Sequence, residues 1–472
     1  MPSTVEKIYL SSPIFVQQII VAIYGWKWYR RRYNIHFDEL TSCLYAHDKW
    51  TATQFKEYQE NNLERILTIA WNAPYYREIF SSARISRNDP PFTALGKLPY
   101  LSKEVLRVHA RDLLTQKNIP RSVMVFKSSG TTGTPTEIYY TPEFHALELA
   151  VPAVRNLGWA GIDYRARRVM FGVRKVCRFD QNRPPFWRYS PVENMAYASI
   201  YHLSQQNLPY YIEFLRHYRP QIIMGYPSSL YTVSRYALDN NDLPAPAAGV
   251  FTTSETVSDR IRDSLEAAWQ CKVHDRYGAV EGCLFASQCE YGSYHVSPEA
   301  GIVEIIDQDG MPCPPGQMGE VICTGLQNTL QPLIRYRIGD VARWAENQEC
   351  PCGRAMPILE AIEGRFEDIC VTPDGREMLR FDTVFKGVDG IKEAQVVQEK
   401  VDQFIVYVVP VERLTQQTEE LIKYNMRLHV GQVQTEVIPV GEIPRSSSGK
   451  FRAVISKLSM EEKRQALRSS QA

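Results

Sequence analysis

Between residues 123 and 253 the chain alternates short apolar runs with longer segments in which apolar residues recur at helical spacing. Short β-branched or apolar runs are typical of buried strands, and strands that alternate with helices favour a layered α/β fold. The clearest runs are Val123–Phe126, Arg168–Gly172, Gln221–Gly225 and Gly249–Thr253. We therefore expect an α/β protein, preceded by a helical region that includes residues 55–70 and breaks near Pro74.

The pattern changes again toward the C-terminus. Gly301–Gly310 and Gly319–Gly325 look like two strands around an Asp-Gly turn, which predicts a β-rich segment at the end of a large domain. The remaining elements predict a compact α+β domain. They are two strands within Lys392–Pro410, a helix near Gln417–Val430 and a strand at Thr435–Pro439.

A chain of 472 residues exceeds what one hydrophobic core usually supports. We expect a large N-terminal domain at residues 1–366 and a small C-terminal domain at residues 367–472. No low-complexity linker separates them. The boundary therefore rests on the change of pattern and on the family resemblance given below.

Charge and cysteine usage exclude two classes of protein. The chain has 54 Lys and Arg against 53 Asp and Glu, so it lacks the basic excess of proteins whose main partner is nucleic acid. Its ten cysteines are scattered, and no secretory signal is recognisable. This usage predicts reduced thiols and a cytoplasmic location rather than a disulfide framework.

The most apolar N-terminal segment is Ile14–Trp26, which is too short to span a bilayer and is interrupted by Gln17 and Gln18. Its basic cluster, 30–32, follows it, whereas a signal peptide has its charge first. We expect no transmembrane segment. The favoured interpretation is an amphipathic helix packed on the body of the protein, and the alternative is a helix that lies on a membrane surface.

The sharpest local signal is a loop of glycines and hydroxyl residues just after a predicted strand. It consists of Ser128, Ser129, Gly130, Thr131, Thr132, Gly133 and Thr134. Glycines permit tight turns, and the hydroxyl and amide groups can surround phosphate oxygens. The loop is not a Walker-type P-loop, because Thr134 stands where GxxxxGK[ST] needs a lysine. Taken alone, the loop is as consistent with an ordinary loop as with a phosphate site.

Several ordered motifs together resemble the adenylate-forming superfamily, and within it the phenylacetate-CoA ligase and capsule-biosynthesis-like branch. The match covers nearly the whole chain. The motifs are Ala73–Arg77, Leu98–Lys103, the Ser128 loop, Pro220–Ser229, Arg276–Glu281, Tyr336–Asp340, Gly364–Asp368 and Pro444–Lys450. The resemblance implies an ATP- and Mg²⁺-dependent ligase that activates a small carboxylic acid as an acyl-adenylate.

The resemblance also implies which residues bind the nucleotide. Tyr277 is expected to stack near the adenine, since an aromatic face suits a purine. Asp340 is expected to accept hydrogen bonds from the ribose hydroxyls, although Ile338 stands where the family often has Thr. The full predicted set is the Ser128 loop with Ser254, Glu255, Tyr277, Gly278, Asp340, Arg365 and Lys450.

The catalytic residues implied by the resemblance are Lys450, Glu281 and Arg365. The Lys450 ammonium would stabilise charge that develops between the carboxylate and the α-phosphate. Glu281 would hold Mg²⁺, because a carboxylate is a hard oxygen ligand. Arg365 would contact the ribose or phosphate, and the next residues, Glu367 and Asp368, match the hinge about which the small domain swings. Without the resemblance, the interpretation of all these residues would be that they are charged side chains on the protein surface.

A metal site is the second chemical hypothesis. Cys289 and His295 combine with Cys350 and Cys352 to provide four ligands of the kinds that tetrahedral Zn²⁺ prefers. Members of this branch carry a similar set, so the resemblance implies a structural zinc that closes a loop. The alternative is a group of unrelated thiols and an imidazole. The rival thiol ligands are Cys283, Cys313 and Cys323.

The sequence says less about the second step, in which the activated acyl group is transferred to an acceptor. Coenzyme A is the commonest acceptor in the family, and transfer to it would give an acyl-CoA thioester. Acyl-CoA-forming relatives have a glycine-rich stretch after the hinge, whereas only Gly375 survives here. An amine or a carrier-protein thiol is therefore the alternative acceptor. A nucleotidyltransferase and a non-catalytic scaffold remain further alternatives.

The identity of the acid rests on a few residues. Tyr226, Phe251 and Ser254 are expected to line a substrate pocket, and the aromatic side chains favour an aryl acid. Aromatic residues in an α/β domain are also common in the core, which is the alternative interpretation. Family analogy suggests a homodimer.

Overall fold

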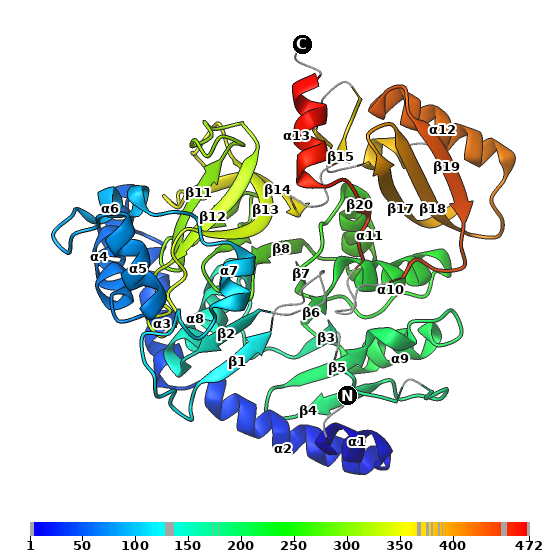
Figure 1. Ribbon diagram of the computed structural model, residues 1–472. Coiled ribbons are helices and arrows are strands. Elements are labelled where there is room, and N and C mark those ends of the chain that lie inside the picture. Colours follow the sequence, from blue (N-terminus) through cyan, green and yellow to red (C-terminus); the bar gives the residue numbers. More distant parts are fainter. Residues whose placement is uncertain are drawn as a thin grey trace. The chain divides into compact units, whose positions relative to one another are not determined.

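The computed structural model describes residues 4–127, 136–172, 174–178, 180–365, 370–373, 377–378, 381–385, 388, 390–444 and 451–469. Its internal contacts divide the chain into two compact units (Figure 1). The first unit contains residues 1–338 and 342–361, and the second contains residues 339–341 and 362–472. The boundary expected at 366/367 lies outside the described residues.

The first hundred residues form helices, as predicted. Capping side chains define several starts: Thr51 begins one helix with a complete capping box, and Asn34 and Ser102 accept backbone N–H bonds at two others. The helices are α1 (Thr4–Ser11), α2 (Ile14–Arg32), α3 (Ile35–His47), α4 (Ala52–Ala70), α5 (Pro74–Ser82), α6 (Pro91–Lys97) and α7 (Lys103–Val108).

A mixed sheet organises the first unit, and its spatial order is β11-β12-β13-β14-β10-β9-β8-β7-β6-β3-β5-β4. The strands β5, β3, β6, β7 and β8 run parallel, and antiparallel strands flank them at β4 and β9. The central strands are β3 (Arg168–Gly172), β4 (Trp187–Ser190), β5 (Met195–Ser199), β6 (Ile222–Gly225), β7 (Gly249–Thr253), β8 (Val273–Gly278) and β9 (Phe285–Gln288). A separate antiparallel pair joins β1 (Met124–Lys127) to β2 (Glu137–Tyr140).

Helices connect the parallel strands and supply the core. The chain leaves β5, β6 and β7 through α9 (Leu208–Tyr218), α10 (Pro227–Asp239) and α11 (Asp259–Trp269), which pack side by side. Their buried apolar residues join those of the strands in one cluster, which includes Phe171, Leu215, Leu230 and Trp269. Before β3 the chain forms α8 (Pro142–Pro152) and continues into a π-helical turn, η1 (Ala153–Gly158), that contacts β8 and β9.

The β-rich segment also follows the prediction. Strands β11 (Gly301–Ile306) and β12 (Gly319–Gly325) pair antiparallel. The Asp307 carboxylate accepts backbone N–H bonds from Asp309 and Met311 at 2.9 Å and so shapes the expected Asp-Gly turn, where Gly310 has a φ of +80°. The remaining strands are β10 (Tyr294–Val296), β13 (Tyr336–Trp344) and β14 (Ile358–Arg365).

The second unit is the predicted compact α+β domain. Its four-stranded sheet has the order β19-β18-β17-β20, and Val396, Val406 and Phe404 pack against Ile422 and Met426 of its helix. The strands are β17 (Ile391–Lys400), β18 (Gln403–Pro410), β19 (Gln434–Pro439) and β20 (Val454–Ser456). The other elements are β15 (Cys370–Val371), β16 (Glu377–Met378), η4 (Asp382–Phe385), α12 (Gln416–Val430) and α13 (Met460–Ser469).

Helix α2 packs beside the edge strand β4, along the lower edge of Figure 1. We expected an amphipathic helix packed on the body, and the packing is confirmed. The orientation differs from that of an ordinary amphipathic helix, because Gln17 is buried while Phe15 and Ile19 face solvent. Among the described residues, no helix combines the length and the hydropathy that crossing a membrane requires.

Candidate functional site

Residues predicted to bind the nucleotide or to line the acid pocket come from three separate motifs and meet at one edge of the sheet. Tyr226 follows β6, Ser254 and Glu255 follow β7, and Tyr277 lies near the end of β8. These strands are parallel neighbours, paired through Gly225 with Thr252 and through Thr253 with Arg276, so their carboxyl ends lie side by side. The chain continues from β3 toward β5 and from β6 toward β7. The topological switch point, where open α/β sheets bind ligands, therefore lies between β3 and β6, beside this edge.

Backbone strain and a helix cap occur together after β7. Ser254 has a φ of +73°, which is rare for a residue with a side chain and is often found at functional sites. The Glu255 carboxylate accepts the Ser228 backbone N–H at 2.9 Å and therefore caps the first turn of α10. Burial, together with the Glu255 charge, raises the pKa of Tyr226. The sequence-predicted Glu255 thus lies at this edge, held at a helix N-terminus.

Glu281 lies in the turn that follows β8 and is only 6% exposed. Tyr336, a fully buried residue of β13, donates a hydrogen bond from its hydroxyl to Glu281 Oε1 at 2.9 Å. The turn needs Gly282, since its φ is +65° and an added Cβ would collide with the Phe144 ring. The carboxylate is therefore positioned by a residue from another motif, one whose role we did not predict.

A second carboxylate near Glu281 was also not predicted. Glu148 of α8 accepts a hydrogen bond from the Tyr140 hydroxyl, which also contacts the backbone oxygen of Val280. Burial raises the pKa of Glu148 to about 7, and the Glu281 charge adds to this effect, while the Tyr140 hydrogen bond and Arg276 oppose it. No motif surrounds Glu148, and only the fold brings it close to the 276–281 segment.

The structure describes some of the other predicted site residues and leaves the rest outside its described ranges. Asp340 lies on β13 after Gly339, whose φ is +85°, and Gly278 ends β8. Phe251 is 4% exposed and packs with Leu157 and Ile222, so the structure places it in the core. Arg365 ends β14, but its side chain is not described. The residues that lie outside the described ranges are the Ser128 loop (128–134), Glu367, Asp368 and Lys450.

The four predicted metal ligands come together. The ligand atoms of Cys289, His295, Cys350 and Cys352 all lie within 4.8 Å of one another. The first two flank the turn between β9 and β10, and the other two lie in the loop between β13 and β14. The Sγ atoms of Cys289 and Cys350 are 3.7 Å apart, and Cys352 Sγ lies 3.3 Å from His295 Nε2.

These distances fit a tetrahedral zinc site. Bonds of about 2.3 Å to sulfur separate two tetrahedral ligand sulfurs by about 3.8 Å. His295 Nδ1 lies 3.3 Å from the backbone oxygen of Met356, and a bond to that oxygen would leave Nε2 free to bind a metal. The rival thiols have other partners. Cys283, Cys313 and Cys323 donate to the backbone oxygens of Glu281, Met318 and Tyr336 respectively.

A buried ion pair lies between the π-helical turn η1 and the segment that follows β10, near the cysteine-histidine cluster. Arg155 is fully buried and forms two hydrogen bonds to Glu299, at 2.6 and 2.8 Å. Although burial opposes ionisation, Arg155 and a hydrogen bond from His47 lower the pKa of Glu299 to about 2. Trp159 follows the turn and contacts the His295 ring edge-on at 5.8 Å. The turn thus connects the ion pair with the cysteine-histidine cluster.

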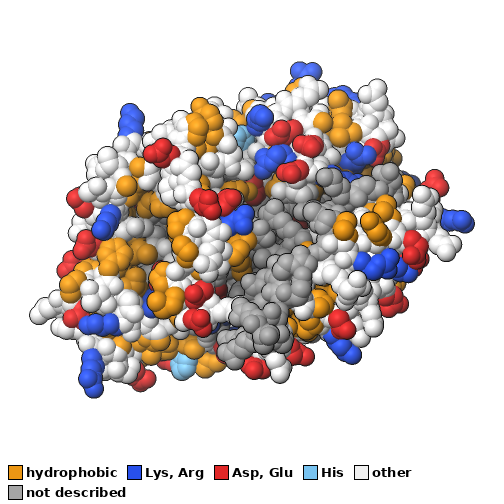
Figure 2. Space-filling model, turned by 90° about the horizontal axis from the view of Figure 1, so that it is seen from above, with side chains coloured by type: hydrophobic (Ala, Val, Ile, Leu, Met, Phe, Trp, Pro, Cys, Tyr) orange, Lys and Arg blue, Asp and Glu red, His pale blue; other side chains and the backbone are white. Residues whose placement is uncertain are grey.

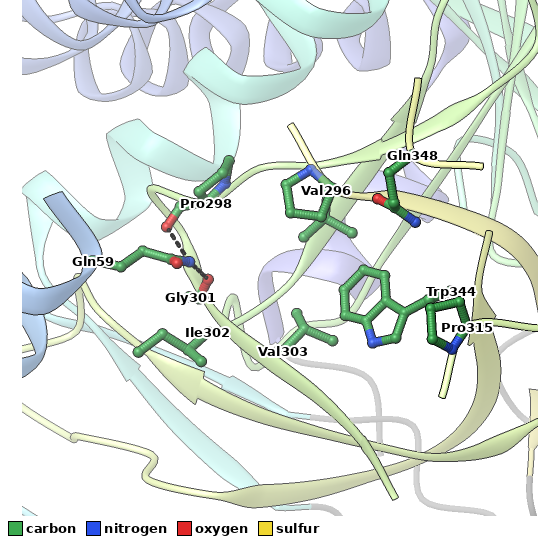
Figure 3. A pocket seen from close by; sticks show the side chains of 10 residues that line it. Gln59, Val296, Pro298, Gly301, Ile302, Val303, Pro315, Trp344 and Gln348 are labelled. Atoms are coloured by element: carbon green, nitrogen blue, oxygen red, sulfur yellow. Dashed lines mark hydrogen bonds between the residues drawn. The ribbon is translucent and has the colours of Figure 1, made fainter. Parts of the chain in front are cut away.

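Figure 3 shows a pocket of about 300 Å³ that contains none of the predicted site residues. Trp344 and Gln348 line one side, and Gln59 of α4 lies opposite them. The Gln59 amide donates to the backbone oxygens of Pro298 and Gly301, at 3.3 and 2.9 Å. These bonds join α4 to the β-rich segment, so the pocket lies at a structural junction away from the carboxyl edge of β6, β7 and β8.

The chain is similar to known proteins over most of its length. Protein CapK of Staphylococcus aureus is 26% identical over 459 residues, which cover 96% of this chain and 99% of CapK. A phenylacetate-coenzyme A ligase of Thermus thermophilus is 24% identical over 439 residues, 85% of this chain and 96% of the ligase. Residues 371–457 match the family model of the CapK C-terminal domain. Over most of its length the chain is thus similar to CapK and to phenylacetate-coenzyme A ligases.

Solved structures show the same fold. A 2-hydroxyisobutyryl-CoA ligase, crystallised in the postadenylation state with 2-HIB-AMP, superposes with a TM-score of 0.66. The alignment covers 89% of this chain and 93% of the ligase, at 19% sequence identity. The fold class inferred from the sequence, a large α/β domain with a small α+β domain, is therefore that of adenylate-forming ligases.

Proposed function

We propose that the protein is a ligase that uses ATP and Mg²⁺ to convert a small carboxylic acid into an acyl-adenylate and then transfers the acyl group to a thiol. In the first step the substrate carboxylate attacks the α-phosphate of ATP and pyrophosphate leaves. In the second step the thiol attacks the acyl carbon and AMP leaves. Such catalysis relies on positioning and on charge neutralisation.

The observation that carries the proposal is the meeting of Tyr226, Ser254, Glu255 and Tyr277 at the carboxyl edge of β6, β7 and β8, beside the switch point of the parallel sheet. These residues come from three motifs that resemble one superfamily. Glu281 follows Tyr277 within the last of these motifs. A nucleotide site is the simplest reason for them to converge there.

The proposed roles follow from side-chain chemistry. Tyr277 supplies an aromatic face for the adenine, and Asp340 accepts hydrogen bonds from the ribose. Glu281 suits Mg²⁺ because it is a buried carboxylate oriented by Tyr336, and bound Mg²⁺ would neutralise phosphate charge. The Ser128 loop would cradle phosphates, while Arg365 and Lys450 would stabilise negative charge at the reacting centre.

Coenzyme A is the proposed acceptor and an aryl acid the proposed substrate class, because four relatives are phenylacetate-coenzyme A ligases. The aryl assignment now rests on these relatives and on Tyr226, since Phe251 is part of the core. The loss of most glycines after the hinge supports an amine or a carrier-protein thiol as the second candidate acceptor. A cytoplasmic homodimer stays a prediction.

We also propose that Cys289, His295, Cys350 and Cys352 hold a structural zinc ion. The ligand number and the ligand types support a closed tetrahedral site, as do the Cys289–Cys350 and Cys352–His295 separations. A closed site leaves no position for a substrate. Its role would be to join the β9–β10 turn to the loop between β13 and β14.

Carboxylate-dependent exchange of labelled pyrophosphate into ATP tests the adenylation step. The purified chain would be incubated with Mg²⁺ and a panel of aryl and short aliphatic acids, without any acceptor. Exchange with one acid is the expected result and identifies the substrate. If ATP binds but no acid supports exchange, the proposal fails in favour of a binding or scaffold role.

The acceptor is tested with the acid that supports exchange. Release of AMP that depends on coenzyme A supports thioester formation. Release that depends on an amine or on a carrier protein supports the second candidate. Retention of labelled AMP on the product identifies a nucleotidyltransferase instead.

A further inference from the structure

Helix α2 attaches to the sheet through polar side chains. Gln17 accepts two hydrogen bonds from Arg188, at 2.9 and 2.6 Å, and Gln18 exchanges hydrogen bonds with the Tyr189 backbone. Gly25 lies so close to β4 that an added Cβ would collide with Ser190 Oγ. These contacts cover the edge strand β4 and fix the rotation of the helix about its axis.

The opposite face of α2 is an exposed apolar stripe, formed by Phe15, Ile19, Ile23 and Trp26. Their exposed fractions are 68%, 54%, 63% and 52%. Spacings of four, four and three residues place them on one side of the helix, over a length of about 17 Å. A helix whose glutamines point inward and whose isoleucines point outward is opposite to the usual arrangement on a protein surface.

Basic side chains continue the stripe at its C-terminal end. Lys27 and Arg30 are exposed, and the Arg30 guanidinium lies over the Trp26 ring at 5.1 Å. Residues 14–32 contain four basic residues and no acidic one, although the whole chain is nearly neutral. On the face seen in Figure 2, acidic and basic side chains are instead intermixed. The exposed face of α2 therefore combines apolar, aromatic and cationic groups in sequence along one helix.

We propose that α2 docks the protein on the surface of an anionic lipid bilayer. The stripe would enter the boundary between headgroups and acyl chains, Trp26 would lie at headgroup level, and Lys27 and Arg30 would contact lipid phosphates. The helix would lie in the plane of the interface and stay attached to β4 through its glutamines.

A bilayer fits this face better than a second copy of the chain. A two-fold antiparallel pairing of α2 helices would bring Arg30 of each copy toward the positive end of the other helix dipole. A fluid lipid surface also accepts a rigid stripe without a matching protein groove. Charge complementarity thus selects anionic lipid as the occupant.

Vesicle sedimentation with the 472-residue chain tests the proposal. The probes are vesicles of phosphatidylcholine with phosphatidylserine and vesicles of phosphatidylcholine alone. We expect binding to the anionic vesicles that weakens as salt is added. The double variant Phe15→Gln/Ile23→Gln should reduce the partition coefficient at least about tenfold, and Lys27→Gln/Arg30→Gln should reduce it roughly thirtyfold on anionic vesicles only.

The matched control is Tyr424→Gln/Leu428→Gln on α12, which removes two other exposed apolar side chains, 56% and 62% exposed. The control should bind vesicles like the wild type, and the melting temperature of every variant should match the wild type. Equal loss in the control, or no binding of the wild type to anionic vesicles, overturns the proposal. So does a dimer, measured by light scattering, that Phe15→Gln/Ile23→Gln dissociates.

Discussion

At the scale of single residues, Glu281 shows how the fold prepares a side chain for a role that a motif only implies. The residue belongs to the Arg276–Glu281 motif, but its orientation comes from Tyr336, the first residue of another motif. Both side chains are buried, so the hydrogen bond between them is shielded from water. If Glu281 holds Mg²⁺, Tyr336 is a positioning residue and not a metal ligand.

Substitutions should separate these two roles. Glu281→Gln removes the charge that would bind Mg²⁺, so pyrophosphate exchange should fall by about two orders of magnitude or more. Tyr336→Phe keeps the buried ring and the carboxylate charge and should lower exchange only roughly tenfold, through loss of one hydrogen bond to a charged group. Exchange rates measured across a Mg²⁺ titration should show a raised Mg²⁺ requirement for Glu281→Gln.

The control for this pair is Glu320→Gln, which neutralises a half-buried carboxylate on β12 that is not predicted to bind Mg²⁺. It should leave the Mg²⁺ requirement unchanged. An unchanged Mg²⁺ requirement in Glu281→Gln as well would contradict the proposed magnesium role.

Glu148 makes a prediction about pH. Its pKa is raised by burial from 4.5 to about 7. Well below pH 4.5 the carboxyl is protonated in both the folded and the unfolded state, so it does not change the free energy of unfolding. Between 4.5 and 7 the unfolded state releases a proton that the folded state keeps, so stability falls as pH rises, by up to about 3 kcal/mol.

Glu148→Gln removes this titration while keeping an oxygen that can accept the Tyr140 hydrogen bond. The variant should therefore gain stability relative to the wild type as pH rises from about 5 to about 8. Urea unfolding of both proteins at several pH values measures the difference. A difference that does not change over this range would show that Glu148 has an ordinary pKa in the folded protein.

At the scale of elements, the cysteine-histidine cluster lies where β10 pairs with β9 on one side and with β14 on the other. Cys289 and His295 flank a short turn with Gly292 at a φ of +87°, and the other two ligands sit in the loop before β14. Arg354 adds to this junction by pairing with Glu290 at 2.8 Å and stacking over Trp159 at 4.2 Å. A zinc ion would add a cross-link between these loops.

Cys352→Ser should therefore abolish bound zinc and lower the melting temperature. A chelator should lower the melting temperature of the wild type but not that of the variant, because only the wild type has metal to lose. Cys313→Ser, at a buried thiol outside the cluster, is the matched control and should retain zinc. Wild-type protein purified without zinc, whose melting temperature does not respond to added zinc, would contradict the site.

The side of helix α2 that packs against the protein also depends on its neighbouring element. Its sequence predicts a helix, but the side that packs is decided by β4, an edge strand with exposed backbone groups that need partners. Gln18 satisfies the Tyr189 backbone, which no isoleucine could do. The apolar stripe is therefore left for another surface.

At the scale of the whole molecule, two compact units suit an enzyme that catalyses two half-reactions. The resemblance implies that Lys450 acts in adenylation only. Lys450→Ala should thus lower adenylate formation by orders of magnitude, measured as pyrophosphate exchange, and leave capture of a preformed acyl-adenylate largely intact. Equal loss of both half-reactions would argue against separate catalytic conformations of the small domain.

The sequence by itself determined the local elements and the chemical identity of the candidate sites. The alternation of apolar runs predicted β3, β6 and β7, and the later patterns predicted β11, β12 and the small domain, because strand and helix periodicity are local properties. The four candidate zinc ligands were also named from residue type and from the resemblance to the branch. The tertiary structure then brought all four within 4.8 Å, across a separation of about sixty residues.

Only the tertiary structure decided which side chains are buried and what they touch. It placed Phe251 in the core, joined Glu281 to Tyr336 and put Glu148 close to Glu281. It also turned Gln17 of α2 inward. Burial and hydrogen bonding depend on partners that are distant in the chain. The periodicity of one segment cannot predict these partners, because they come together only when the strands and helices pack.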